Sequence, residues 1–100
     1  MIQLSGCAEA LYTDLPFVER IEAIARLGIP AFEFWAYAEK DLNAIAQTAS
    51  TANMKCAGIV CDTGGPLVDA ANRDNVAGAV AQSIDAAKTL DCRTMIVTVG

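Results

Sequence analysis

Histidine is absent from the 100-residue sequence, and no two of its four cysteines form a C-x-x-C pair. Without a histidine base, the serines have no partner for a Ser-His-Asp triad. A structural zinc site needs closer ligand spacing than these cysteines offer. We therefore predict neither a serine hydrolase nor a zinc finger, and expect four buried thiols in a reducing compartment. The four are Cys7, Cys56, Cys61 and Cys92. Cys56 and Cys61, five apart in one strand-like run, are expected on opposite faces.

Positive charge is also scarce. Seven basic residues stand against twelve acidic ones, giving a net charge of −5, and the basic residues are scattered singly. A nucleic-acid partner requires clustered Lys and Arg, so we expect none. No apolar run approaches the roughly 18 residues of a membrane span. The opening segment, residues 1–16, has no basic region of the kind that begins a secretory signal, so we expect a cytoplasmic protein.

What the sequence does contain is a regular alternation of strand-like and helix-like segments. Helical spacing of apolar residues predicts three helices. The first has Pro16 in its first turn and ends at Gly28; the second is capped by Asp41 and stopped by Asn53. The third covers about residues 74–90. Their apolar stripes are Phe17, Ile21, Ile24 and Ala25, then Leu42, Ile45, Ala46 and Ala49, then Val76, Val80, Ile84 and Ala87.

Four strands are predicted around these helices. They cover residues 1–7, 31–35, 55–62 and 93–99. Strands that alternate with helices indicate right-handed crossovers and a parallel sheet. The sequence therefore predicts a single α/β domain over residues 1–100, with four parallel strands and three helices.

In parallel β/α folds, ligands bind at the carboxyl ends of the strands. That rule selects the candidate binding residues Glu9, Trp35 and Asp62, together with the neighbouring positions Cys7, Tyr37, Cys61, Thr63, Thr98 and Gly100. Glu33 lies one step inside its strand, on the face that Ala31 and Trp35 share. Trp35 and Tyr37 fit either a packing role or a stacking platform.

Glu33 interrupts a nearly all-apolar run, GIPAFEFWAY at residues 28–37. One interpretation makes it an edge-strand carboxylate that reaches water, or one paired with Arg93 or Lys55. The other makes it part of a polar cluster that lines a pocket, where flanking aromatic side chains exclude water. The sequence leaves both open.

The loop DTGGP at residues 62–66 also has several interpretations. It matches neither common phosphate-binding glycine pattern and does not lead directly into a helix. A glycine-hinged lid, a phosphate cradle and ordinary turn chemistry are all compatible with it, and turn chemistry is favoured.

Four segments together resemble a known family. They read S-G-C-A-E-A-L-Y-T-D-L-P-F, G-I-P-A-F-E-F-W, C-D-T-G-G-P-L-V-D and I-V-T-V-G. In this order and spacing the chain resembles the start of a hydroxypyruvate isomerase-like protein, from the xylose isomerase-like superfamily of sugar isomerase and epimerase TIM barrels. The resemblance covers nearly all 100 residues, and Glu33 and Trp35 match the family's strand-two glutamate and pocket-wall aromatic.

The resemblance implies a (β/α)₈ barrel that interconverts hydroxypyruvate and tartronate semialdehyde, or a related sugar keto/aldehyde pair, through an enediol. It implies an intramolecular oxidoreductase in which a divalent metal, Mg²⁺ or Mn²⁺, polarises the oxygens while glutamates move the proton. Within the family the metal ligands come from strands five to eight. A whole barrel needs about 250 residues, so the sequence corresponds to the first half, four strands and three helices.

Three expectations follow from a half-barrel. These 100 residues alone are expected to hold no metal ligands or catalytic residues and to be inactive. Open strand edges are expected to cause self-association, or to be covered by a missing carboxyl-terminal half-barrel. Two non-enzymatic alternatives remain: a flavodoxin-like binding domain with helices on both sheet faces, and a half-barrel scaffold. Three polar residues lie among apolar neighbours in the predicted strands: Ser5, Glu33 and Thr98. They favour a sheet with a few polar groups on one face, as inside a barrel.

Overall fold

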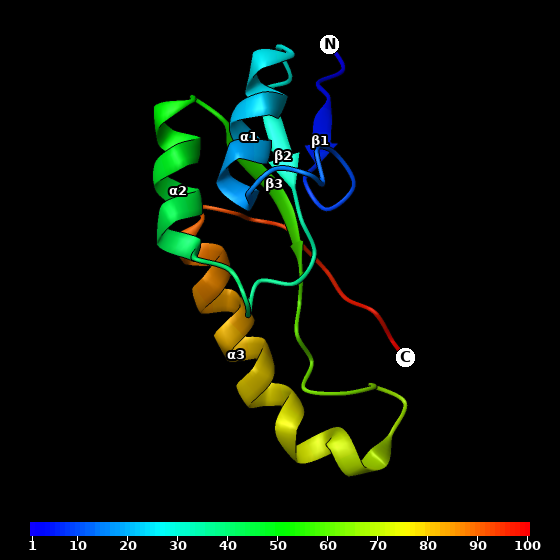
Figure 1. The fold of residues 1–100 in the computed structure, drawn as a ribbon. Helices are drawn as coiled ribbons and strands as arrows, with labels where there is room; N and C mark the ends of the chain where they lie inside the picture. Colours follow the sequence, from blue (N-terminus) through cyan, green and yellow to red (C-terminus); the bar gives the residue numbers. More distant parts are fainter.

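The computed structural model describes all residues, 1–100, and its elements follow the predicted order (Figure 1). The strands are β1 (Ser5–Cys7), β2 (Ala31–Glu33), β3 (Lys55–Val60) and β4 (Met95–Ile96). The helices are α1 (Phe17–Arg26), α2 (Leu42–Thr51) and α3 (Arg73–Thr89), with one short 3₁₀ turn, η1 (Ala70–Asn72). None of the helices is long and apolar enough to cross a membrane.

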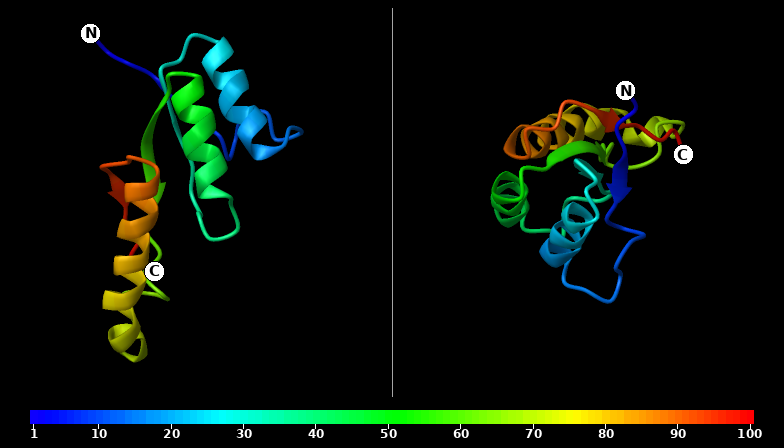
Figure 2. Two further views of the ribbon diagram at one scale, coloured as in Figure 1. Left: turned by 90° about the vertical axis from the view of Figure 1, so that its left-hand side faces the viewer. Right: turned by 90° about the horizontal axis from the view of Figure 1, so that it is seen from above.

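The four strands are all parallel and lie in the sheet in the order β1-β2-β3-β4. Right-handed crossovers that all step in one direction place every helix on the same face of the sheet. Figure 2 shows α1, α2 and α3 arranged around the outside of a curved sheet. A flavodoxin-like fold requires a reversal of strand order to cover both faces. That alternative is therefore wrong, and the first-half barrel is confirmed.

The buried core lies between the sheet and this single layer of helices. Phe32 and Phe34 point into it from β2 and the residue after it, with their rings stacked 6.3 Å apart. All three helices contribute apolar side chains to the same cluster, including Ile21, Ile24, Ile45, Ala49, Ala86 and Ala87. Gly6 is needed here, because a Cβ at that position would lie 2.8 Å from the Cγ2 atom of Ile24. Helix α1 therefore packs directly against the β1 backbone.

The helix ends follow the chemistry that the sequence indicates. The Asp41 carboxylate accepts a hydrogen bond from the Ala44 backbone N–H at 3.1 Å, as an N-cap does. Asn53 and Gly28 adopt left-handed conformations, with φ of 55° and 82°, and stop α2 and α1. Pro16 precedes α1 instead of lying in its first turn. Asp91, after α3, adopts φ of 50° where a glycine is usual.

All four predicted strands are too long, and the second ends at Glu33 instead of residue 35. Residues 1–4 and 97–99 are exposed and belong to no strand, and β3 stops at Val60. Ser5 pairs with Ala31, so Leu4 stands opposite Pro30, which has no N–H to offer. Both β1 and β4 are also edge strands, with a pairing partner on one side only.

The apolar stripe predicted for α3 is confirmed in part. Ala87 is buried and Val76 and Val80 are half-buried, but Ile84 is 40% exposed, and the other side chains that α3 buries are Ser83 and Ala86. Small residues at the contact let this long helix lie close to the sheet, and the larger apolar residues fall to its flank. Side-chain size is therefore a poor guide to the buried face of α3.

A register shift in β3 alters the expected placement of the cysteines. The pairing of β2 with β3 slips between Phe32 and Glu33, so Cys56 and Ile59 both point into the core although they are three residues apart. Cys61 follows the end of β3, is buried outside that core cluster and lines a pocket, so its expected position on the face opposite Cys56 stays a prediction. All four cysteines are free thiols. Three are buried as expected, but Cys7 is only half-buried.

Candidate functional site

A pocket of about 460 Å³ lies at the carboxyl ends of β2, β3 and β4, where the parallel fold predicts ligand binding. Its wall comes from the segments that follow these three strands. They contribute Trp35, Ala36, Tyr37 and Ala38; Val60, Cys61, Asp62, Thr63, Gly65 and Pro66; and Thr98 and Gly100. Of the predicted binding residues, Trp35 and Asp62 line the pocket.

Trp35 forms the exposed aromatic wall of this pocket. Its side chain is 55% exposed, so it does not serve as core packing, which Phe32 and Phe34 supply on the opposite face. Tyr37 is half-buried and packs against the core, while its ring also lines the pocket. Tyr37 therefore has a packing role, whereas Trp35 does not pack in the core, and its binding role stays a prediction.

A buried serine on α3 holds the pocket together. Ser83 is fully buried, and its Oγ lies 2.9 Å from the Tyr37 hydroxyl and 2.8 Å from the Asp62 backbone N–H. The same oxygen lies 3.1–3.2 Å from the carbonyl oxygens of Ala79 and Asp62, which can accept its single proton. Either hydroxyl can be the donor in the bond between Tyr37 and Ser83. One side chain thus fixes the β3 terminus and the β2–α2 loop relative to α3.

Residues 62–66 are held by local side-chain hydrogen bonds of the kind that the turn interpretation of DTGGP predicts. The Asp62 carboxylate accepts the Gly64 backbone N–H at 2.8 Å, and the Thr63 hydroxyl donates to the Gly65 carbonyl at 2.7 Å. Buried Asn72 donates from Nδ2 to the Thr63 carbonyl at 3.0 Å. One oxygen of Asp62 is therefore occupied by the turn, and the carboxylate is held at the pocket wall.

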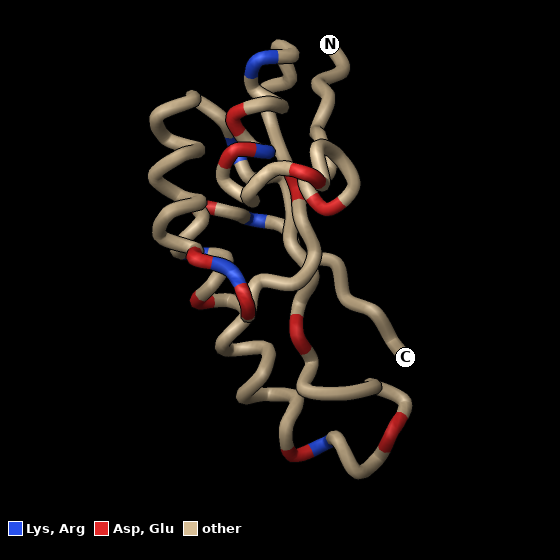
Figure 3. The backbone as a smooth tube through the Cα atoms, viewed as in Figure 1, with Lys and Arg blue, Asp and Glu red and all other residues tan.

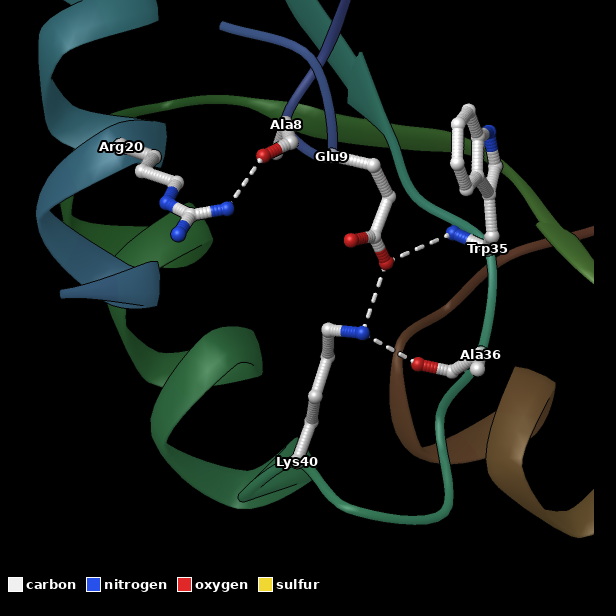
Figure 4. Close-up of polar contacts among 6 residues, drawn as sticks. All are labelled: Ala8, Glu9, Arg20, Trp35, Ala36 and Lys40. Carbon is white, nitrogen blue, oxygen red and sulfur yellow. Dashed lines mark hydrogen bonds and ion pairs between the residues drawn. The ribbon is translucent and has the colours of Figure 1, made fainter. Parts of the chain in front are cut away.

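Glu9 lies on the β1–α1 loop in a separate polar cluster (Figure 4). Its Oε1 accepts a 2.7 Å ion pair from the Lys40 ammonium and a 3.2 Å hydrogen bond from the Trp35 backbone N–H. Lys40 also donates to the Ala36 carbonyl, and its ammonium lies 5.0 Å from the centre of the Phe17 ring. The cluster ties the β1–α1 loop to the segment that carries the pocket wall.

Opposing influences act on the Glu9 carboxyl. Burial alone raises its pKa, but the hydrogen bond from Lys40, the Trp35 N–H and the positive charges of Lys40 and Arg20 together bring the pKa below its ordinary value of 4.5. Glu9 is therefore ionised at neutral pH. With two donors already bound to one oxygen, it is placed to position Trp35.

Arg20 supports the same loop from α1. Its guanidinium donates to the carbonyl oxygens of Leu15, Ala8 and Thr13 at 2.9, 3.0 and 3.1 Å. The carbonyl of Ala8, next to Glu9, is thus fixed to α1 (Figure 4). The planar guanidinium binds three carbonyl groups of the loop. These hydrogen bonds fix the backbone of residues 8–15, which form no helix or strand.

Glu33 lies on the inner face of the sheet, away from the helices. Its neighbours Phe32 and Phe34 are buried on the helix side, so alternation turns Glu33 to the face of Ala31 and Trp35. The side chain is half-buried, and the pairing with Arg93 or Lys55 is not formed, since the one ion pair in the structure joins Lys40 to Glu9. Glu33 is not part of the pocket lining; it stands below Trp35 on the open inner surface.

The residues present do not fit a divalent metal by themselves. No group of three His, Cys, Asp or Glu side chains lies close enough to hold an ion. Glu9 is paired with Lys40 and one Asp62 oxygen is held by Gly64, which leaves Glu33 as the carboxylate with no partner among these three. We therefore assign no metal step to these 100 residues.

Several residues of the site have only weak signals in the sequence. Ser83 is one of many small residues in α3, and nothing in its spacing marks it as a hydrogen-bonding centre. Lys40 and Asn72 lie in loop-like stretches, where a charged or amide residue is ordinary. Only a knowledge of which loops meet at the sheet edge identifies them.

Comparisons with known proteins agree with the fold. No protein-family profile matches the sequence, and no curated protein matches it. The crystal structure of an AP endonuclease, family 2, from Brucella melitensis superposes with a TM-score of 0.88 at 22% identity, over 95% of this chain and 40% of that one. A xylose isomerase-like TIM barrel/4-hydroxyphenylpyruvate dioxygenase fusion protein gives a TM-score of 0.76 at 17% identity, over 96% of this chain and 16% of that one.

These similarities are to solved structures of low identity, and they establish the fold alone. The chain spans less than half the length of either structure and has the architecture of the first half of a TIM barrel.

Proposed function

We propose that these residues supply the first four β/α units of a metal-dependent sugar isomerase or epimerase, which interconverts hydroxypyruvate and tartronate semialdehyde or a related keto/aldehyde pair. One observation carries the proposal: an aromatic-walled pocket lies at the carboxyl edge, and Glu33, two residues before the pocket residue Trp35 on the same strand face, has no ion-pair partner. Enediol chemistry needs a site of this kind, in which polar groups face a small polyoxygenated ligand while water is partly excluded.

In this proposal Trp35 shields the reacting carbons, and Glu33 and Asp62 accept hydrogen bonds from substrate hydroxyls. Glu9 acts indirectly, because its carboxylate holds the Trp35 backbone. The divalent metal of the family, when bound, would polarise the carbonyl oxygen. Its ligands are not among these 100 residues. The roles proposed for Trp35, Glu33, Asp62 and Glu9 do not include binding the metal.

The pocket lining contains no Lys or Arg, which bears on the choice of substrate. An anionic phosphate backbone is disfavoured by this lining and by the net charge of −5. Hydroxypyruvate also carries a negative charge, in its carboxylate, and no cation in this lining would bind it. These residues therefore favour uncharged sugar keto/aldehyde pairs as substrates, unless residues elsewhere bind the carboxylate.

The test measures deuterium uptake from heavy water at the carbon beside the carbonyl, by proton NMR. The natural gene product that carries these residues is supplied with Mg²⁺ or Mn²⁺ and with hydroxypyruvate or neutral ketoses. Glu33→Gln should lower kcat/KM roughly 10- to 100-fold, as expected when a hydrogen bond to a charged group is lost. Glu22→Gln, on the exposed face of α1, makes the same chemical change and should leave the rate unaltered.

Full activity in Glu33→Gln, or exchange with none of these substrates, would contradict the proposal. The 100-residue chain assayed alone should show no metal-dependent exchange, because it holds no metal ligand set. Metal-dependent turnover by that chain would show that the metal ligands do lie within these residues and that the proposed division of roles is wrong.

A further inference from the structure

Neither the helix nor the core in which Ser83 lies explains why this residue is a serine. Ser83 is fully buried in α3, where the other buried side chains are Ala86 and Ala87. Alanine favours a helix more than serine does and leaves no polar atom to satisfy. A buried hydroxyl costs free energy unless it forms hydrogen bonds. The advantage of the serine therefore lies in the residues that it contacts.

Ser83 contacts two residues of the pocket without lining the pocket itself. Its Oγ lies 2.9 Å from the Tyr37 hydroxyl and 2.8 Å from the Asp62 backbone N–H, and both of these residues line the pocket. Tyr37 belongs to the segment after β2 and Asp62 to the segment after β3. Ser83 can therefore affect a bound ligand only through Tyr37 and Asp62.

Asp62 depends on Ser83 because its strand has already ended. β3 stops at Val60, and the Asp62 N–H donates to the Ser83 side chain instead of to a neighbouring strand. The carboxylate of Asp62 is held separately, since its Oδ1 accepts the Gly64 backbone N–H at 2.8 Å. With the backbone N–H and one carboxylate oxygen both fixed, the position of the second carboxylate oxygen is defined as well.

No ion pair holds this part of the pocket wall. Residues 75–84 of α3 carry no charged side chain, as the long tan stretch of this helix shows (Figure 3). The one ion pair in the structure joins Lys40 to Glu9, and Asp62 is the only charged residue in the pocket lining. The hydrogen bonds of Ser83 are therefore the polar contacts through which α3 holds the pocket wall.

We propose that Ser83 is a positioning residue of the candidate site, which fixes Tyr37 and Asp62 relative to each other and thereby sets the affinity for substrate. The inference rests on the proposed function, in which Asp62 accepts a hydrogen bond from a substrate hydroxyl. Groups that are ordered before binding cost the ligand nothing to order. Without the serine oxygen, Tyr37 and Asp62 become ordered only when the ligand binds, and this cost appears as a higher KM.

The experiment measures kcat and KM for deuterium exchange by the natural gene product, with a substrate that the wild type accepts. Ser83→Ala should raise KM roughly tenfold and change kcat by less than about twofold, because two residues lose their prior order. A loss of folded protein alone would lower kcat and leave KM unaltered, so the two constants separate positioning from stability. Ser50→Ala removes the same atom from the exposed side of α2 and should change neither constant.

Tyr37→Phe tests the same contact without a change in α3, because it removes only the hydroxyl of a half-buried ring. It should also raise KM, and it should have no further effect when combined with Ser83→Ala, which already removes the partner of that hydroxyl. If Ser83→Ala fails to fold, the KM of Tyr37→Phe decides alone. An active wild type with an unaltered KM in these variants, or with a fall in kcat only, overturns the inference and leaves the proposed function intact. No exchange by the wild type overturns the proposed function and the inference with it.

Discussion

Replacement of Ser83 by alanine removes the oxygen on which the pocket wall depends. Ser83 is fully buried, accepts a hydrogen bond from the Asp62 backbone N–H and shares a hydrogen bond with the Tyr37 hydroxyl. Alanine fits the same space, so the change creates almost no cavity. What it leaves behind is an Asp62 N–H and a Tyr37 hydroxyl without their partner.

The expected loss of stability follows from those groups. A donor left unsatisfied away from water costs about 1–3 kcal/mol. The Tyr37 hydroxyl is half-buried and reaches water more readily, so the Asp62 N–H dominates. We expect Ser83→Ala to lower the free energy of unfolding by about 2 kcal/mol, which corresponds to a fall in Tm of roughly 8–16 °C for a domain of this size.

Thermal and urea unfolding followed by circular dichroism measure this loss, at one fixed protein concentration because association shifts apparent stability. A double-mutant cycle with Tyr37→Phe isolates the bond between the two hydroxyls, and its coupling should be about 0.5–1.5 kcal/mol. The control Ser50→Ala, on the exposed side of α2, should change stability by less than about 0.5 kcal/mol. A Ser83→Ala loss as small as that of the control, or fully additive single changes, would refute the reasoning.

Two further substitutions and one alkylation experiment test other parts of the structure. Lys40→Met should lower stability at neutral pH by about 1–2 kcal/mol, since the paired side chains are 17% and 18% exposed. Because the folded pKa of Glu9 lies below its unfolded value of 4.5, the wild type should lose this contribution as pH falls below about 4.5, and the difference from Lys40→Met should shrink there. Gly65→Ala should cost about 2–3 kcal/mol, because φ is +146° and the new Cβ would lie 2.9 Å from Asn72 Oδ1. Burial, followed by the neighbouring Cys92 thiol, raises the pKa of Cys56 to about 12, so Cys56 should resist iodoacetamide at pH 8 until the protein unfolds.

Each of these changes has a matched comparison. Lys88→Met, on the exposed last turn of α3, should leave the acid limb of the pH–stability curve unchanged; an equal effect there would remove the case for Glu9. Gly78→Ala, within α3 and with open space around it, should stabilise by up to about 1 kcal/mol, opposite in sign to Gly65→Ala. Cys7, which is half-buried, should react before Cys56; the reverse order would contradict the burial described.

The order of the helices and strands and most helix ends were predictable from the sequence, because these features depend on local chemistry. The Asp41 cap and the left-handed stop at Asn53 act within a few residues of themselves, so their signals are complete in the chain. Strand lengths were less predictable. They depend on which segment lies alongside, as the unpaired residues 1–4 beside Pro30 illustrate.

The position of the candidate site was predictable from the sequence, but most of the contacts within it were not. The rule that ligands bind at the carboxyl ends of parallel strands found Trp35 and Asp62, which line the pocket. It could not reveal that Glu9 is held by Lys40, or that Ser83 joins two loops, because those contacts link residues 31 and 46 positions apart. The binding role of Glu33 stays a prediction.

The fold and the site both depend on the strand order, because this order places all helices on one face of the sheet and all carboxyl ends of the strands at one edge. Scalar couplings across hydrogen bonds, measured by NMR on the isotopically labelled chain, report that order directly. The structure predicts a coupling from the Ala8 amide nitrogen to the Glu33 carbonyl carbon, and another from Phe34 to Gly58. Couplings that join the first strand to the third, as in an order that reverses within the sheet, would contradict the half-barrel and the site built on it.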